Sequence, residues 1–244
     1  MNSNTQFASA GIIAGHQPHY LPWVGYFNKI YQSDHFCLVD SIQFNKKWFQ
    51  NRNKIRTRDG DMWLTVPVKT CGKFDQNICD VEIDNSIPWR RKHWKTINLA
   101  YQKAPYFHLY KDFLADAYTR DWKLLVDLNE YLIRGFLSFL NIEKKITRSS
   151  SFQPQGKKTE LLIDICRKTH ASGYLSGTGN AHQYVNVDMF RAANLIHVFQ
   201  NFTHPIYPQI HGEFKPKMAI IDLLCNCGPD SERYVKQEAA SQSV

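Results

Sequence analysis

An α/β fold with a doubly wound, mostly parallel sheet is predicted by two stretches of this chain. In the first, apolar runs at 12–14 and 36–39 flank a segment whose apolar residues recur at helical spacing. In the second, a helical pattern at 159–168 leads into a short apolar run at 173–175. Two strands joined by a helix lie parallel with a right-handed crossover, so both stretches favour a parallel sheet.

Three helical patterns follow one another in the middle of the chain, at 88–101, about 106–118 and 121–140. Because no strand pattern separates them, they predict a helical insertion. Further strands are expected at 62–68, near 78–83 and at 195–199, a last helix is expected to open at Pro216, and the polar stretch 149–158 is typical of a linker. The expected division is an N-terminal α/β half at 1–87, the insertion at 88–148, the C-terminal half of the same domain at 149–237, and a frayed tail at 238–244.

Composition indicates a folded protein with a positive charge. The 43% hydrophobic content suits a globule, and the formal net charge of +8 favours an anionic partner. Much of that charge lies in two clusters, at 46–58 and 90–95, for which two solvated faces are the alternative. The start of the chain lacks the apolar core of a secretory signal, and no run approaches the roughly 20 apolar residues that span a bilayer. A cytoplasmic location is therefore expected.

Several common functional motifs are missing from the sequence. The six cysteines include no Cys-x-x-Cys pair, and Cys225-x-Cys227 has no second ligand pair. His211-x-Glu213 lacks the His-Glu-x-x-His spacing of a zinc helix, so no metal site is expected. Neither a P-loop, a Gly-x-Gly-x-x-Gly fingerprint nor a Gly-x-Ser-x-Gly elbow occurs.

Candidate site residues gather where the expected strands end. In open α/β sheets ligands bind outside the carboxyl ends of the strands, often against the N-terminus of the next helix. After the apolar runs come polar side chains and one small residue that lets backbone approach a ligand closely. The residues are His16, Gln17, His19 and Tyr20 after the first run, Asp40 and Gln43 after the second, and Ser176 and Gly177 after 173–175.

Two further groups are candidates for substrate binding. Asn51 and Asn53 flank Arg52, and two amides around a guanidinium can bond phosphate or sugar hydroxyls without titrating. The alternative is that both asparagines cap turns. His211 and Glu213 lie in an irregular polar and aromatic loop, where binding groups tend to collect, although surface or structural roles explain them as well.

The chain also resembles a known family through long motifs: His-Gln-Pro at 16–18, Tyr-Leu-Pro-Trp-Val-Gly-Tyr-Phe at 20–27, Gln-Phe at 43–44, Asn-Arg-Asn-Lys-Ile at 51–55, Trp-Leu-Thr-Val-Pro-Val at 63–68, Tyr-Leu-Ser-Gly at 174–177 and Ile-Ile-Asp-Leu-Leu at 220–224. Over roughly residues 11–234 it is similar to the WbqC-like family. The resemblance implies a bacterial protein of O-antigen and other surface-polysaccharide gene clusters that acts on an amino-sugar intermediate. Where the family leads us to expect an Asp-Asp pair, this chain has Asp40-Ser41, which weakens a two-carboxylate metal site.

One functional hypothesis is enzymatic. His16-x-x-His19 after the first strand is similar, by fold analogy, to the histidine pair that nucleotidyltransferase-like Rossmann variants place over the α-phosphate of ATP. Two imidazoles at a helix N-terminus, helped by Arg52, would stabilise charge growing on phosphorus. With the family's setting, this predicts a transferase or ligase that forms an amide on a nucleotide-linked amino sugar. The group transferred is an acyl or aminoacyl group, with glycyl as one option.

In this hypothesis His16, Asp40 and His19 are catalytic. The partners are a nucleotide-linked sugar and a small carboxylate or acyl donor. ATP, with Mg, is the cofactor if the adenylation analogy holds; another activated donor would give the same amide without it.

Two other classes of function compete with the enzyme. A non-catalytic protein that docks a sugar nucleotide or a glycolipid, with peripheral membrane contact, fits the cations and the lack of a complete catalytic set. Nucleic-acid binding is disfavoured, because only charge and interleaved aromatics such as Trp48 and Phe49 support it. The sequence leaves the donor, the sugar and the oligomeric state open.

Overall fold

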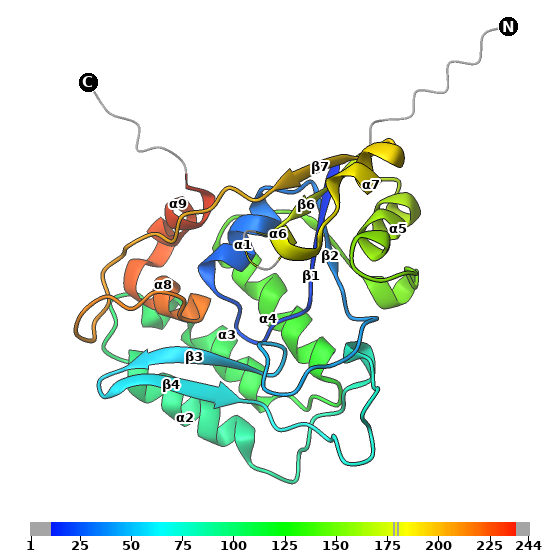
Figure 1. Ribbon diagram of the computed structural model, residues 1–244. Helices are drawn as coiled ribbons and strands as arrows, with labels where there is room; N and C mark the ends of the chain where they lie inside the picture. Colours follow the sequence, from blue (N-terminus) through cyan, green and yellow to red (C-terminus); the bar gives the residue numbers. More distant parts are fainter. Residues whose placement is uncertain (1–10, 178, 180, 238–244) are drawn as a thin grey trace, which may run out of the picture. The chain divides into compact units, whose positions relative to one another are not determined.

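The computed structural model describes residues 11–177, 179 and 181–237 (Figure 1). The chain divides into two compact units, each assembled from segments far apart in the sequence. The sheet unit comprises Met1–His16, Lys29–Ser41 and Lys144–Asn201, and the helical unit comprises Gln17–Asn28, Ile42–Glu143 and Phe202–Val244. The expected frayed tail at 238–244 lies outside the described residues.

The sheet unit contains a five-stranded parallel sheet in the order β5-β2-β1-β6-β7. Counted along the chain within this sheet, the order is third, second, first, fourth, fifth, which is that of a doubly wound fold. The predicted α/β class is therefore confirmed, and the N-terminal and C-terminal strand segments share one sheet. The strands are β1 (Ile12–His16), β2 (His35–Leu38), β5 (Lys145–Arg148), β6 (Gly173–Ser176) and β7 (Ile196–Phe199).

The central strand β1 is buried as an apolar run because neighbours cover it on both edges. Ile13 and Ala14 have no exposed surface. Gly15 follows them, and there is no room for a side chain at this position. A Cβ there would lie 2.7 Å from the Tyr174 hydroxyl and 3.0 Å from the Val39 side chain. The absence of a side chain at Gly15 thus lets β1, β6 and the chain after β2 pack closely.

Short helices connect the strands of this unit. α5 (Thr159–Thr169) packs on β6 and buries Leu162, Ile165 and Cys166, the three positions that the helical pattern predicts to face inward. α6 (Ala181–Tyr184) and α7 (Val187–Ala192) lie between β6 and β7, and α7 packs on β7 and α5. α1 (Val24–Tyr31) follows β1; its residues 24–28 group with the helical unit and 29–31 with the sheet unit.

Strand β5 was not predicted, because Lys-Ile-Thr-Arg carries a single apolar residue. It is an edge strand, where polar side chains are tolerated and only Ile146 is buried. The expected linker after it begins with a short 3-10 helix, η2 (Ser149–Ser151).

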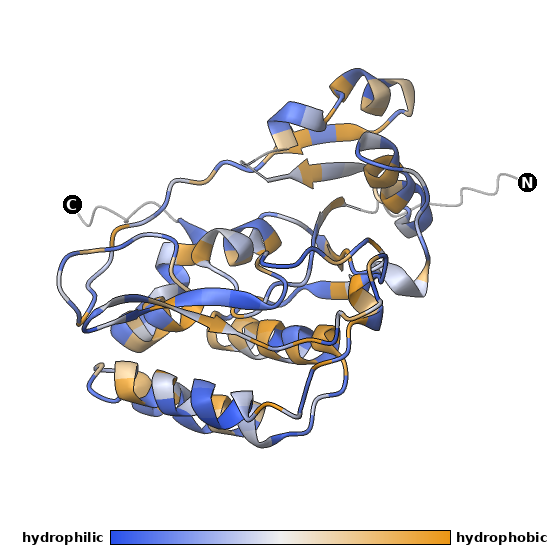
Figure 2. Cartoon of the chain, turned by 60° about the horizontal axis from the view of Figure 1, so that its bottom comes forward, coloured by the Kyte–Doolittle hydropathy of each residue, from blue (hydrophilic) through white to orange (hydrophobic). Residues whose placement is uncertain are grey.

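The helical unit holds the three helices of the predicted insertion, the predicted last helix, an unpredicted helix at 231–236 and an antiparallel hairpin. The hairpin pairs β3 (Arg52–Thr57) with β4 (Gly60–Thr65). Figure 2 colours β3 largely hydrophilic, in line with its three cations, and this composition explains why the sequence indicates a basic segment here and not a strand. The helices are α2 (Trp89–Tyr101), α3 (Phe107–Thr119), α4 (Leu125–Phe139), α8 (Ile220–Cys227) and α9 (Ser231–Lys236), with short 3-10 helices η1 (Ile78–Asp80) and η3 (Gly228–Asp230).

The strand expected at 62–68 is β4, which begins at Gly60 and ends at Thr65. Three further element boundaries in this unit differ from the expectation, each because backbone groups pair with a distant segment. Near 78–83 the chain forms η1 and then two isolated bridges instead of a strand. α4 starts at Leu125, because Ile83 donates its N–H to the carbonyl of Lys123 and holds that segment extended. α8 starts at Ile220 and not at Pro216, because the Ala219 N–H donates to the Lys54 carbonyl.

The excursion between β2 and β5 is larger than the expected insertion. All of Ile42–Glu143 belongs to the helical unit, including the hairpin. The domain boundaries expected at 87 and 148 stay a prediction. Among residues 11–177, 179 and 181–237, none of the helices has the length and apolarity that crossing a bilayer requires.

Gly15→Ala is expected to destabilise the protein by about 1–3 kcal/mol, because the added methyl group overlaps the Tyr174 hydroxyl in a tightly packed site. Urea unfolding would measure the loss. Gly179→Ala is the matched control, since a Cβ at Gly179 meets nothing within 4 Å. Equal stability of the two variants would contradict the close packing around Gly15.

Candidate functional site

The carboxyl ends of β1 and β6 adjoin at the point where the strand order reverses across the sheet. β2 lies on one side of β1 and β6 on the other, and such switch points are where open α/β sheets bind ligands. The register that pairs Ala14 with Leu175 puts His16 level with Gly177. Three predicted site residues, His16, Ser176 and Gly177, therefore meet at one edge of one sheet.

The two residues at the end of β6 have different surroundings. The Ser176 side chain is buried, and its hydroxyl lies 2.8 Å from Nε2 of His197 on β7. Burial lowers the pKa of His197, with a smaller effect from His182. At Gly177, by contrast, a Cβ would have only ordinary contacts, the nearest at 3.8 Å. The edge thus offers open backbone at Gly177 beside a hydroxyl that is already hydrogen-bonded.

Lys29 is the residue at this edge that sequence reasoning missed. Only 5% of its surface is exposed, and Nζ donates to the Gly15 carbonyl at 2.7 Å. The same carbonyl accepts a second bond, 3.3 Å long, from the Tyr174 hydroxyl. Nζ would lie 3.8 Å from a Cβ on Gly177, which places the amine next to the open loop.

The electrostatics of Lys29 are unusual for a lysine. Burial lowers its pKa to about 7, and within the described part of the chain no carboxylate forms an ion pair with it. Buried charges in proteins are normally paired with an opposite charge. An anionic ligand at the switch point would provide that charge. Helical spacing alone could not reveal a buried amine without a carboxylate partner, because the sequence pattern of α1 shows only that apolar residues surround Lys29.

Asp40, predicted to be catalytic, is fully buried with both oxygens occupied. Oδ1 accepts from the Ser149 hydroxyl at 3.1 Å and from the Ser150 N–H at 2.8 Å, while Oδ2 accepts from the Ser150 hydroxyl at 2.8 Å. In return the Ser149 oxygen accepts from the backbone N–H of Asp40 and Ser41. This carboxylate joins the chain after β2 to η2 after β5, and its role in the chemistry stays a prediction.

Gln17, His19 and Tyr20 lie in the helical unit. The Tyr20 hydroxyl contacts His93 Nδ1 at 2.9 Å and the Tyr118 hydroxyl at 2.5 Å, so this ring is part of the core. His19 is buried, and its ring lies 5.5 Å from the rings of Tyr26 and Phe49. The Gln17 side chain accepts from Gln50 at 2.8 Å. Their predicted roles in catalysis and binding are untested, and their observed contacts brace the loop.

The predicted binding group on the hairpin divides in two. Asn51 donates to the Val66 carbonyl at 2.9 Å and Asn53 to the Leu21 carbonyl at 2.6 Å, so both amides bond to distant backbone and do not cap turns through these bonds. Arg52 instead lies with its guanidinium 4.4 Å from the centre of the Trp63 ring. Gln43 is exposed and donates to the Phe74 carbonyl at 3.1 Å.

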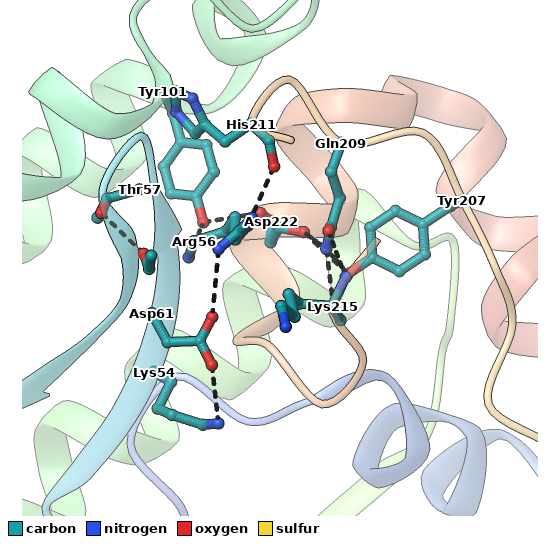
Figure 3. Close-up of polar contacts among 11 residues, drawn as sticks. Lys54, Arg56, Thr57, Asp61, Tyr101, Tyr207, Gln209, His211, Lys215 and Asp222 are labelled. Carbon is teal, nitrogen blue, oxygen red and sulfur yellow. Dashed lines mark hydrogen bonds and ion pairs between the residues drawn. The ribbon is translucent and has the colours of Figure 1, made fainter. Parts of the chain in front are cut away.

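His211 is held from both sides in the helical unit, as Figure 3 shows in part. Its Nε2 lies 2.8 Å from the Ala100 carbonyl, which only accepts, so Nε2 carries the proton. Its own carbonyl accepts from Arg56 Nε at 3.1 Å. Glu213, two residues on, is exposed. A binding role for either residue stays a prediction.

Asp222, at the centre of Figure 3, is a second residue that sequence reasoning did not select. Its buried carboxylate accepts from the hydroxyls of Tyr101 and Tyr207, each at 2.9 Å, and from the Gln209 amide at 2.6 Å. Burial raises the pKa of Asp222 despite these three donors. The carboxylate connects α8 to α2 and to the loop at 207–209. The Ile-Ile-Asp motif was the only signal in the sequence.

The fold and this edge define a Rossmann-like α/β protein with a candidate ligand site at the switch point of its sheet. The chain belongs to the WbqC-like protein family, whose model matches residues 17–234. It is also similar to the protein Rv1507c of Mycobacterium tuberculosis, itself described as uncharacterized, with 34% identity over 226 residues that cover 91% of this chain and 97% of the relative. No solved structure matches the chain. Lys29, Asp40, Ser176 and Gly177 lie inside the matched region, and His16 immediately precedes it.

The buried amine of Lys29 should give the protein a distinct pH dependence. Its pKa is about 7 when folded and 10.5 as the ordinary value, so between these pH values the unfolded chain binds more protons. The free energy of unfolding therefore rises with pH over this window, by up to about 1.4 kcal/mol per pH unit. Lys29→Met lacks this contribution. The free energy of unfolding of the unmodified protein should therefore rise relative to that of Lys29→Met from pH 7 to pH 9, and urea unfolding at pH 7, 8 and 9 would measure the difference. Lys157→Met, at an exposed position, is the control and should follow the unmodified protein at every pH. A difference for Lys29→Met that does not change with pH would contradict the lowered pKa of Lys29.

Asp222→Ala is expected to lower the free energy of unfolding by about 3 kcal/mol or more, because two tyrosine hydroxyls and an amide lose their buried acceptor. Calorimetry should show a melting temperature lower by about 6–12 °C. Asp121→Ala removes a carboxylate that is 94% exposed, and it should change stability little. Similar melting temperatures for the two variants would show that the network contributes no stability.

Proposed function

We propose that this protein forms an amide on a nucleotide-linked amino sugar, in the biosynthesis of bacterial O-antigen or another surface polysaccharide. Membership of the WbqC-like family supports a biosynthetic role. The observation that carries the reaction proposal is the buried Lys29 amine at the switch point, next to open backbone at Gly177. A phosphate-bearing substrate supplies the negative charge that this amine lacks.

In this proposal the diphosphate of the sugar nucleotide lies at the carboxyl edge of the sheet. Lys29 is protonated when the ligand binds, because a neighbouring anion favours the charged form of an amine. Gly177 lets the backbone approach the phosphates closely. Binding is therefore coupled to proton uptake above about pH 7, the folded pKa of Lys29.

His16, at the end of β1, takes the proton of the amino group as it attacks the acyl carbonyl. The new carbon–nitrogen bond forms while the bond from the carbonyl carbon to its leaving group breaks. Asp40 acts by holding the chain after β2 in place, since both its oxygens are engaged. His19 is proposed to help orient the loop that follows His16 and not to react.

The donor is a small carboxylic acid that must reach the site in activated form. The amine and the open loop fit the phosphates of ATP, with Mg, as well as those of a sugar nucleotide, so an ATP-dependent ligase is one form of the proposal. A transferase that takes a preformed acyl thioester is the other, and it needs the same residues for the amine and the sugar.

Mass spectrometry of reactions with UDP- or dTDP-amino sugars tests the proposal, with a carboxylate plus Mg-ATP in one series and acyl-coenzyme A in another. We expect the sugar nucleotide to gain the mass of the acyl group, and His16→Ala to lower turnover about a hundredfold or more. Lys29→Met should weaken sugar-nucleotide binding, while Lys157→Met matches the unmodified protein. Unchanged turnover in His16→Ala would remove His16 from the mechanism.

Thermal shift separates the non-catalytic alternative. A ligand at about a hundred times its dissociation constant stabilises a protein by about 2.7 kcal/mol. Stabilisation by a sugar nucleotide with no acylated product in either series would identify a carrier of the nucleotide sugar and contradict the enzyme.

A further inference from the structure

A connected row of aromatic side chains lies on and beside the hairpin of the helical unit. The Trp48 and Phe49 rings are 5.8 Å apart, and the Phe49 and Trp63 rings are 5.9 Å apart. Trp48 is 48% exposed and Trp63 43% exposed. Large side chains of this kind seldom remain on a surface in a connected row without a partner.

Cations surround this row. Between Lys46 and Arg58 the chain carries six basic residues and no acidic one. Lys46 and Lys47 are exposed immediately before Trp48. The Arg52 guanidinium lies on the Trp63 ring at 4.4 Å, and the Lys54 ammonium is 5.9 Å from the same ring. Cations and indoles thus occupy one continuous surface.

The hairpin geometry explains why these groups share a face. Side chains alternate along a strand, and directly opposite residues of an antiparallel pair lie on the same face. Arg52, Lys54 and Arg56 therefore lie on one side of β3, and Trp63 is opposite Lys54. Alternate residues of β3 face the core, among them Ile55, which has no exposed surface.

Only part of this positive charge is neutralised within the protein. Lys54 and Arg56 share the carboxylate of Asp61, at 3.2 and 3.6 Å. Within the described ranges, Arg52 makes no ion pair, and its Nε is buried without a hydrogen bond. Net positive charge beside exposed indoles remains for an external partner.

We propose that this surface, formed by Lys46, Lys47, Trp48, Phe49, Arg52 and Trp63, binds the face of an anionic lipid bilayer. Tryptophan prefers the headgroup level of a membrane, where its ring meets hydrocarbon and its N–H meets water. Lysine and arginine near such a surface each contribute favourably through attraction to anionic lipids. A bilayer of anionic lipids offers both kinds of contact at once, over a broad area.

Single-stranded nucleic acid is the main competing partner, since it also attracts cations and stacks on aromatic rings. Stacking needs an accessible ring face, however, and the Arg52 guanidinium covers one face of Trp63. Contact with lipid headgroups does not require a ring face that is free on both sides. It is also independent of the proposed amide chemistry, because its residues belong to the helical unit and the switch point belongs to the sheet unit.

Flotation of the purified full chain with vesicles tests this proposal. We expect binding to phosphatidylglycerol mixed with phosphatidylcholine, no binding to phosphatidylcholine alone, and weakening as salt is raised. Lys46→Glu with Lys47→Glu should weaken binding about tenfold or more, and Trp48→Ala with Trp63→Ala should weaken it by a similar factor.

Matched controls keep the test specific. Arg91→Glu with Lys92→Glu makes the same charge change on exposed positions of α2, and Leu99→Ala removes an apolar side chain that is 59% exposed. Both should bind vesicles almost as the unmodified protein does, and melting curves would verify that every variant folds. Binding that falls equally in hairpin and control variants would overturn the proposal. So would an absence of vesicle binding at low salt, or tighter binding to a single-stranded oligonucleotide than to vesicles.

Discussion

The absence of a side chain at Gly15 is the constraint on which the candidate site depends. The Tyr174 hydroxyl and the Val39 side chain occupy the space that a Cβ would need. The Gly15 carbonyl in turn accepts hydrogen bonds from Lys29 and Tyr174. Gly15 on the central strand therefore determines how closely β6 and the chain after β2 can approach, and its carbonyl holds the buried amine of Lys29 at the carboxyl edge. The position of that amine beside Gly177 follows from main-chain geometry.

Three buried charged groups among the described residues, Asp40, Asp222 and Lys29, are of two kinds. Asp40 and Asp222 each accept several hydrogen bonds, as buried carboxylates normally do, and each joins segments that are distant in the sequence. Lys29 has a carbonyl as its acceptor and, among the residues that the structure describes, no carboxylate in an ion pair. Burying such an amine costs less free energy when it is neutral part of the time, and the lowered pKa of Lys29 indicates that it is. An anionic ligand can therefore pair with the amine, whereas the two carboxylates already have their hydrogen-bond donors.

The two units carry different chemistry. In the sheet unit, the open backbone at Gly177, the half-buried His16 and the buried amine of Lys29 lie at one edge of the sheet. This arrangement suits a small anionic ligand. In the helical unit, cations and indoles spread over the outside of a hairpin, an arrangement suited to a broad anionic surface.

The sequence by itself determined the fold class, the family and the placement of His16, Ser176 and Gly177 at the carboxyl edge of the sheet, although β1 and β6 extend beyond the predicted apolar runs. Apolar runs and helical spacing are local properties, and the end of a buried strand marks the carboxyl edge wherever the strand lies in the sheet. The tertiary structure alone decided which polar groups are satisfied. Tyr20 is bonded to Tyr118, Asp40 to Ser150 and Asp222 to Tyr101, and β5 exists because it pairs with β2. Each of these partners is some 98 to 121 positions away in the sequence, and burial depends on the partner, so no local pattern could distinguish the satisfied acids from the amine of Lys29.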